Sequence, residues 1–311
     1  FSAIDTPFWA ALTAGYLRRK GFRVQILDAN AENMIFEEVV EHIRAVAPRY
    51  AAVVCYSQQA NVCAPIMDAV NALCRQVKEK LPAQKLILSG WHPSALPERS
   101  LKESSADYVL CGEGFHGFEK LLSGVSPEDV PGLCRETDGK VIVNSRCENI
   151  RNLTEELPDV AWDLLPMDQY RAFSWMCLKD FSQRTKYASI FTSLGCPYQC
   201  KFCAIHATYG EHKLREWSPD WVLKQIDILV GQYGVKHINI HDELYVFNPR
   251  HYRPIAEGIL ARGYDLNINA FARVDVLAKI SDEDLALLKK AGFNWLKLGI
   301  ETGSKDIRQN V

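Results

Sequence analysis

Over the first 123 residues, apolar positions follow a helix period and a strand period in turn. The helix-period runs predict helices, and the short runs of aliphatic and β-branched residues between them predict strands. The predicted helices span residues 7–20, 36–46 and 66–77, and the predicted strands span 23–27, 51–56, 85–88 and 108–111. This alternation predicts a Rossmann-like α/β domain, a doubly wound, mostly parallel sheet with helices on both faces.

Small and polar residues follow the predicted strands of this domain. In doubly wound sheets the ligand lies beyond the carboxyl ends of the strands, so residues at these ends are candidate contacts. The candidates after the second, third and fourth strands are Ser57, Ser89, Gly90, His92, Gly112, Glu113 and Gly114. We expect Ser89-Gly90 to form a turn, and His92 is more typical of a turn or surface histidine than of a metal ligand.

Residues 124–186 lose this rhythm. Two short runs, 133–135 and 141–144, flank Asp138-Gly139, which is typical of a β-hairpin. Residues 157–166 are rich in apolar side chains that would be costly to leave in water. This stretch is therefore predicted to be a packed linker rather than a flexible one.

From residue 187 the alternation of strands and helices resumes. The predicted strands are 187–192, 236–240, 266–271 and 295–300, and the predicted helices are 219–233, 249–261 and 281–291. Ser218 and Ser281 stand at the positions of N-caps. Four βα units in succession predict half of a parallel TIM-type barrel, with functional residues at the strand ends.

These patterns divide the chain into three parts: a Rossmann-like domain at 1–123, a linker at 124–186 and a partial barrel at 187–311. The sequence opens in a helix whose preceding strand is missing and ends just after the fourth barrel strand. We therefore expect a fragment of a longer protein.

Composition and charge exclude several classes. The net charge of -2, from 36 basic and 38 acidic residues, favours neither a nucleic-acid partner nor a membrane surface. No apolar run reaches the roughly 18 residues of a membrane helix, and no signal peptide is visible. The ten cysteines are typical of reduced thiols, so a cytoplasmic location is expected.

One group of cysteines stands apart from the others. Cys196, Cys200 and Cys203 have the spacing C-x3-C-x2-C and follow the apolar strand at 187–192. Three thiolates in one loop can hold an iron–sulfur cluster, and a cluster with three protein ligands leaves one iron open for a substrate or cofactor. A zinc knuckle is the alternative for such a loop.

With Phe202 as the aromatic residue before the third cysteine, this loop resembles that of the radical S-adenosylmethionine (SAM) superfamily. The resemblance implies a [4Fe-4S] cluster on the three cysteines. Its open iron would bind the methionine part of SAM, and one electron would cleave SAM to a 5′-deoxyadenosyl radical. The resemblance also implies an external one-electron reductant, such as flavodoxin or ferredoxin.

The same resemblance implies contacts to SAM at three strand ends. Asp242 or Glu243 would receive the amino group, with Glu243 the preferred residue, although the usual Gly-Gly-Glu form is not matched. Glu301 would hold the ribose hydroxyls. Arg273 would contact the SAM carboxylate or form a salt bridge with Asp275.

The first domain resembles the cobalamin-binding domain that precedes the barrel in many radical SAM proteins. The resemblance implies that the corrin's lower tail lies against the small residues after the strands, at Ser57 and Ser89-Gly90. The Asp-x-His-x-x-Gly loop of other cobalamin proteins is absent. A degenerate domain that binds nothing is the alternative.

These features predict a cobalamin-dependent radical SAM enzyme, most simply a methyltransferase that acts on an unactivated carbon or phosphorus of a small-molecule substrate. One alternative is a cobalamin-independent, methylthiotransferase-like enzyme with a vestigial first domain. The other is an iron–sulfur redox module without turnover.

Overall fold

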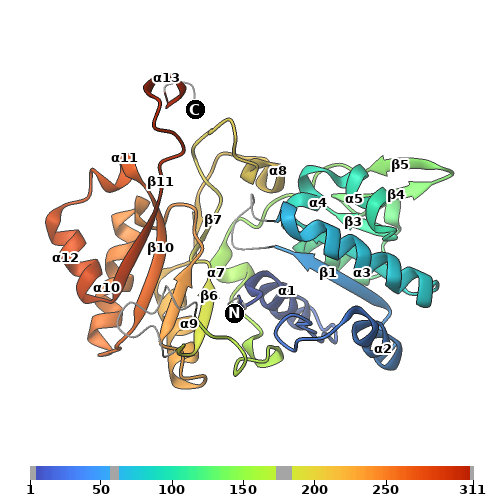
Figure 1. The fold of residues 1–311 in the computed structure, drawn as a ribbon, viewed down its shortest axis with the longest axis horizontal. Helices are drawn as coiled ribbons and strands as arrows, with labels where there is room; N and C mark the ends of the chain where they lie inside the picture. Colours follow the sequence, from blue (N-terminus) through green and yellow to red (C-terminus); the bar gives the residue numbers. More distant parts are fainter. Residues whose placement is uncertain (1–4, 57–62, 173–183, 309–311) are drawn as a thin grey trace. The chain divides into compact units, whose positions relative to one another are not determined.

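The computed structural model describes residues 5–56, 63–172 and 184–308 and divides into two compact units (Figure 1). The N-terminal unit contains residues 9–151 and 203–211. The C-terminal unit contains residues 1–8, 152–202 and 212–311. The predicted boundaries at 123 and 186 stay a prediction.

The N-terminal unit is built on a five-stranded mixed sheet in the order β1-β2-β3-β4-β5. Strands β1 to β3 are parallel, and the hairpin β4-β5 adds two antiparallel strands at one edge, as the Asp138-Gly139 turn predicts. The strands are β1 (Tyr50–Cys55), β2 (Lys85–Gly90), β3 (Tyr108–Leu110), β4 (Leu133–Thr137) and β5 (Lys140–Val143). The helices are α1 (Phe8–Arg19), α2 (Phe36–Val46), α3 (Met67–Lys80), α4 (Trp91–Ala95), α5 (Pro97–Ser104), α6 (Phe115–Leu122) and α8 (Ile205–Tyr209).

Two predictions in this unit are wrong. Residues 23–27 alternate in exposure like a half-buried strand, but within the described residues they pair with no neighbour and form no strand. A strand needs a ladder partner as well as the right pattern. Ser89-Gly90 is the end of β2 rather than a turn, because Gly90 pairs with Cys55 of β1.

The C-terminal unit is built on a four-stranded parallel sheet in the order β11-β10-β9-β6, the arrangement of a partial barrel (Figure 1). A short antiparallel ribbon pairs β7 with β8, which come before and after residues 195–214 in the sequence. The strands are β6 (Tyr187–Ile190), β7 (Ser193–Leu194), β8 (Arg215–Glu216), β9 (His237–Ile240), β10 (Asn267–Arg273) and β11 (Phe293–Gly299). The helices are α7 (Leu153–Glu156), α9 (Pro219–Gly231), α10 (Pro249–Ala261), α11 (Val274–Leu277), α12 (Asp282–Lys290) and α13 (Lys305–Arg308).

The helix caps and the linker packing explain how this unit is held. Ser218 and Ser281 accept hydrogen bonds from the backbone of the first turns of α9 and α12, as predicted. The buried Trp162 ring donates its Nε1–H to Gln225 Oε1 on α9 at 2.9 Å. The segment before the barrel therefore packs against its first helix.

No helix in the described part of the chain is both long and apolar enough to cross a bilayer.

Candidate active site

The cysteine loop follows the end of β6 and the short strand β7. Cys196 and Cys200 are partly exposed, Cys203 is exposed, and the Phe202 ring is 57% exposed. Gly195 takes a positive φ of 91°, which lets the chain turn sharply into the loop. The thiols therefore lie at the surface, where an inorganic ligand can reach them.

The residues fit an iron–sulfur cluster by their donor chemistry. Thiolates are the ligands such clusters take, and three of them stand within one exposed loop. Among the described residues, no three Cys, His, Asp or Glu side chains are grouped closely enough to hold a metal ion. The structure thus shows accessible donors in the right number but not their arrangement around a common centre.

Arg273, at the end of β10, lies beside this loop. Its Nη1 is 3.2 Å from Cys200 Sγ, and its Nε donates to Asp275 Oδ1 at 2.9 Å. The guanidinium also stacks over the Tyr198 ring, 3.9 Å from the centroid. Arg273 therefore forms the predicted pair with Asp275 and at the same time places a positive charge at a cysteine that is predicted to bind the cluster.

Asp242 and Glu243, after β9, have different surroundings. Asp242 is 1% exposed and accepts hydrogen bonds from Thr192 N at 2.6 Å, Thr192 Oγ1 and Ser193 Oγ. Burial raises the pKa of Asp242 to about 6, although these hydrogen bonds favour its charged form. Asp242 is thus occupied in fixing the backbone that leads into the cysteine loop.

Glu243 is the available carboxylate. Among the described residues it has no hydrogen bond or ion pair. Burial, and then the nearby charge of Asp242, raise the pKa of Glu243 to about 7. The structure therefore favours Glu243 over Asp242 as the predicted partner of an ammonium group.

Glu301 lies after β11 with a φ of 61°, and its side chain is exposed. Its predicted contact with the ribose hydroxyls stays a prediction.

In the N-terminal unit, the predicted residues lie at the ends of β2 and β3, except Ser57, which is outside the described residues. Ser89 is fully buried. A Cβ on Gly90 would lie 2.3 Å from the backbone oxygen of Cys55, so glycine is required there by the neighbouring strand. Close packing of β2 against β1 therefore explains the glycine at this position without a cobalamin contact.

The main chain at Gly112, in the loop after β3, is less crowded than that at Gly90. A Cβ on Gly112 would meet only Thr208 O, at 3.6 Å. The small residues here fit a ligand that lies against main chain, such as the tail of a corrinoid.

Two predicted polar residues of this unit, Glu113 and His92, are at least partly buried within the protein. Glu113 is buried, and its Oε2 accepts from Ile150 N at 2.8 Å. His92, within α4, is partly buried, and burial followed by the charge of Arg99 lowers its pKa.

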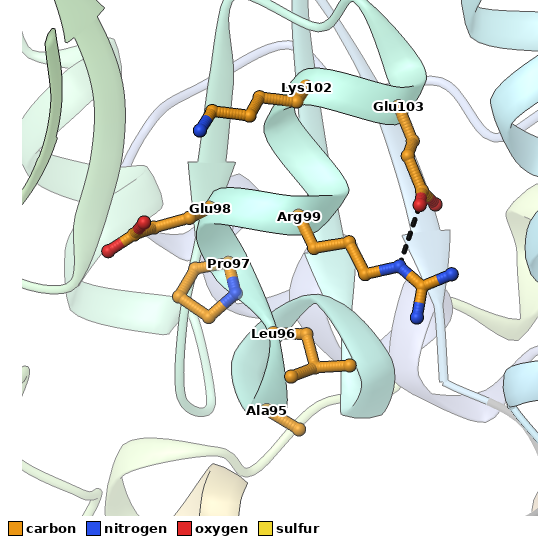
Figure 2. A pocket seen from close by; sticks show the side chains of 7 residues that line it. All are labelled: Ala95, Leu96, Pro97, Glu98, Arg99, Lys102 and Glu103. Atoms are coloured by element: carbon orange, nitrogen blue, oxygen red, sulfur yellow. Dashed lines mark hydrogen bonds and ion pairs between the residues drawn. The ribbon is translucent and has the colours of Figure 1, made fainter.

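The hollow in Figure 2 does not mark the active site. It lies on α4 and α5, where Arg99 Nε and Glu103 Oε1 pair at 2.6 Å. The seven residues around it are Ala95, Leu96, Pro97, Glu98, Arg99, Lys102 and Glu103. None of them is a predicted site residue.

Sequence reasoning missed a second group of polar residues, on the sheet of the C-terminal unit. Asn239, Asn269 and Lys297 lie on neighbouring strands, and both asparagines are fully buried. The available signal was the alternation of Asn267 and Asn269 with Ile268 in the β10 sequence.

Comparison with known families agrees with the two units. Residues 4–122 match the B12 binding domain family, and residues 190–311 match the radical SAM superfamily. The chain joins a B12-binding domain to a radical SAM domain. The predicted family is confirmed, and the [4Fe-4S] cluster, SAM and cobalamin are the cofactors that these domains imply.

Named relatives align with most of this chain. An uncharacterized methyltransferase of Pyrococcus horikoshii is 26% identical, over 98% of this chain and 62% of the relative. The hopanoid C-3 methylase of Methylococcus capsulatus is 29% identical, over 95% of this chain and 53% of the relative. The chain thus spans less than two thirds of either protein.

The fold agrees with a solved structure. The radical SAM methyltransferase TsrM from Kitasatospora setae, determined with tryptophan substrate and a SAM analogue, superposes with a TM-score of 0.75 at 16% identity. The match covers 98% of this chain and 58% of that protein. The predicted α/β architecture, a Rossmann-like sheet followed by a partial barrel, is confirmed.

Proposed function

We propose that the full-length protein is a cobalamin-dependent radical SAM methyltransferase acting on a small molecule. The observation that supports this most strongly is the occurrence in one chain of a B12-binding domain and a radical SAM domain that carries an exposed three-cysteine loop. When bound, the cluster and SAM supply a 5′-deoxyadenosyl radical, and cobalamin carries the methyl group.

Residues of the chain bind and orient these groups. Cys196, Cys200 and Cys203 would hold the cluster. Arg273 would place its positive charge beside Cys200, one of the three cluster ligands.

Glu243 would accept the SAM ammonium group. Asp242 supports Glu243 and the cysteine loop indirectly. Its hydrogen bonds with Thr192 and Ser193 join the end of β9 to the start of the loop.

The substrate and partners of the protein are also proposals. The relatives named above act on a hopanoid and on tryptophan, so the family assignment alone leaves the substrate open. The reaction requires an external one-electron reductant, for which a flavodoxin or ferredoxin in the cytoplasm is suited.

The proposal is tested with anaerobically reconstituted full-length protein. We expect iron–sulfur absorbance, a retained corrinoid, and transfer of a deuterated methyl group from labelled SAM to a product. Cys200→Ala should lose cluster-dependent 5′-deoxyadenosine, whereas Cys74→Ala, at a buried cysteine of the N-terminal unit, should retain it. Formation of 5′-deoxyadenosine by the Cys200 variant would refute the site assignment.

The match of residues 4–122 to the B12-binding family speaks against a vestigial first domain. A wild-type protein that cleaves SAM but never retains corrinoid would favour the cobalamin-independent alternative. A cluster that never cleaves SAM would favour a redox module.

A further inference from the structure

One face of the barrel sheet in the C-terminal unit carries a row of buried polar side chains. Ser189 pairs in register with Asn239, and Asn239 pairs with Asn269. Side chains at paired positions of parallel strands point to the same face. All three residues are fully buried, and we call them the polar row.

The opposite face of the same strands is apolar. Ile238, Ile240 and Ile268 occupy the positions between the polar residues and are buried. The polar row is therefore not the side of the sheet that supplies its aliphatic core. A buried sheet face made of amides and a hydroxyl requires hydrogen-bond partners.

Asn239 has its partners within the protein. Its Oδ1 accepts from Lys297 Nζ at 2.8 Å, and its Nδ2 donates to the Tyr187 hydroxyl at 3.1 Å. Lys297 also lies over the Phe271 ring, 4.5 Å from the centroid. The centre of the polar row is thus fixed by the protein itself.

Asn269, the neighbour of Asn239, differs in this respect. Among the residues that the structure describes, neither its Oδ1 nor its Nδ2 has a hydrogen-bond partner, and the residue is 0% exposed. His241 Nδ1 is likewise buried and has no partner in the described part of the chain, and the His241 ring lies 6.5 Å from that of Phe271, two residues beyond Asn269. A buried amide with both groups unpaired is costly unless a ligand supplies the missing partners.

The charges around the polar row offset each other. The Asp5 carboxylate accepts from the Tyr187 hydroxyl at 2.8 Å and from Ser189 Oγ, and it lies 3.1 Å from His241 Nε2. Tyr187 and Asn239 connect this carboxylate to the Lys297 ammonium group. A ligand at Asn269 meets a positive and a negative group that are already joined, which favours an uncharged ligand.

Asn269 also has a defined distance from the cysteine loop. Asn269 and Arg273 lie on the same face of β10, four residues apart, which corresponds to about 13 Å along a strand. Arg273 contacts Cys200. A ligand that contacts both Asn269 and this end of the strand would span that distance.

We propose that Asn269 binds an uncharged amide-type edge of the substrate, in which a hydrogen-bond donor stands beside an acceptor. One Asn side chain satisfies such an edge with two hydrogen bonds. Peptide amides and nucleobases share this chemistry, whereas a pure hydrocarbon lacks it. That this ligand is the substrate rests on the proposed function. The binding site itself is defined by residues of the C-terminal unit.

The test uses full-length protein and ligand-observed saturation-transfer NMR with three probes: N-acetylalaninamide, uracil and cyclohexane-methanol as the probe without an amide edge. We expect wild-type protein to transfer saturation to at least one amide probe. Asn269→Leu should reduce that signal at least fivefold, and the signal of the third probe should be weak in both proteins. A response to N-acetylalaninamide alone assigns a peptide-like source, and a response to uracil alone assigns a nucleobase.

The matched control is Ile268→Val, on the opposite face of the same strand. We expect it to keep both probe binding and 5′-deoxyadenosine formation. Asn269→Leu should leave the melting temperature unchanged or higher, since it removes an unpaired buried amide. A lower melting temperature than that of Ile268→Val would show a protein partner for Asn269 and overturn the proposal, as would no response to either amide probe.

Failure of the proposed function is distinguishable from failure of this inference. Wild-type protein that binds an amide probe but forms no 5′-deoxyadenosine contradicts the function and supports the site. Wild-type protein that forms 5′-deoxyadenosine but binds neither amide probe contradicts the site alone.

Discussion

Asp242 offers the sharpest test of how the cysteine loop is held. Its side chain is 1% exposed and receives three hydrogen bonds, from Thr192 N, Thr192 Oγ1 and Ser193 Oγ. Thr192 Oγ1 also contacts His251 Nε2 at 2.9 Å, so that hydroxyl keeps a partner when Asp242 is removed. Asp242→Ala thus leaves one backbone N–H and one hydroxyl without an acceptor.

Each unsatisfied buried donor costs about 1–3 kcal/mol. Because the alanine variant also removes a buried charge, we expect a net loss of about 2–4 kcal/mol in the free energy of unfolding. Asp242→Asn keeps an oxygen for Thr192 N, and both hydroxyls can accept from its amide. We expect the asparagine variant to lose less than about 1 kcal/mol relative to wild type at about pH 4.5, where Asp242 is mostly protonated in the folded state.

The pKa of Asp242 adds a pH dependence with a definite sign. Its folded pKa, about 6, lies above its ordinary value of 3.8, so the folded state favours the protonated form. The stability this provides is fully present below pH 3.8 and is lost as the pH rises through 6. Two pKa units correspond to about 3 kcal/mol, and Asp242→Asn should lack this loss.

Urea unfolding of wild type and both variants, between pH 4.5 and 7.5, measures these quantities. The stability of Asp242→Asn relative to wild type should increase with pH. Equal stability of the alanine and asparagine variants at pH 7.5 would refute the hydrogen-bond argument. A difference between wild type and Asp242→Asn that does not change with pH would refute the argument from burial.

Two further predictions follow from the geometry. Gly90→Ala should destabilise the N-terminal unit by about 2–4 kcal/mol in thermal unfolding, because its Cβ would lie 2.3 Å from Cys55 O. The control is Gly231→Ala, which should be neutral because no atom lies within 4 Å of the added Cβ. Equal effects of the two substitutions would contradict the strand contact. SAM affinity measured by equilibrium dialysis should rise several-fold between pH 6 and 8 as Glu243, with a pKa of about 7, becomes charged. Glu243→Gln should bind SAM more weakly and without this pH dependence, and a wild-type profile that is flat would exclude Glu243 as the ammonium partner.

The strands and helices of both units were largely predictable from sequence. Helices α2 and α10 have the predicted bounds, and all four barrel strands lie within two residues of theirs. The failure at 23–27 has a physical reason: hydrophobic alternation reports which side of a segment is buried, but not whether a neighbour pairs with it. The same limit applies to Gly90, whose end-of-strand position depends on Cys55 of another strand.

The candidate site was predictable only where a motif defines it. The cysteine spacing and the strand before it identified the loop. The family resemblance favoured Glu243 over Asp242, but the physical reason for that ranking is not visible in the sequence. That ranking depends on which carboxylate Thr192 and Ser193 already use, and these residues lie about 50 positions earlier in the chain. Hydrogen-bond partners so distant in the sequence are identified only in the folded structure.

The polar row extends this argument to substrate choice. Asn267 and Asn269 stand two positions apart in the predicted strand at 266–271, and the sequence assigned neither of them a role in binding. A strand needs apolar residues on the face that packs against helices, and it has no need of buried amides on the other. Asn239 is satisfied by Lys297 and Tyr187, whereas its paired neighbour Asn269 has no hydrogen-bond partner among the described residues, so the row combines a paired amide with an unpaired one. That asymmetry is expected of a binding surface and has no benefit for folding alone.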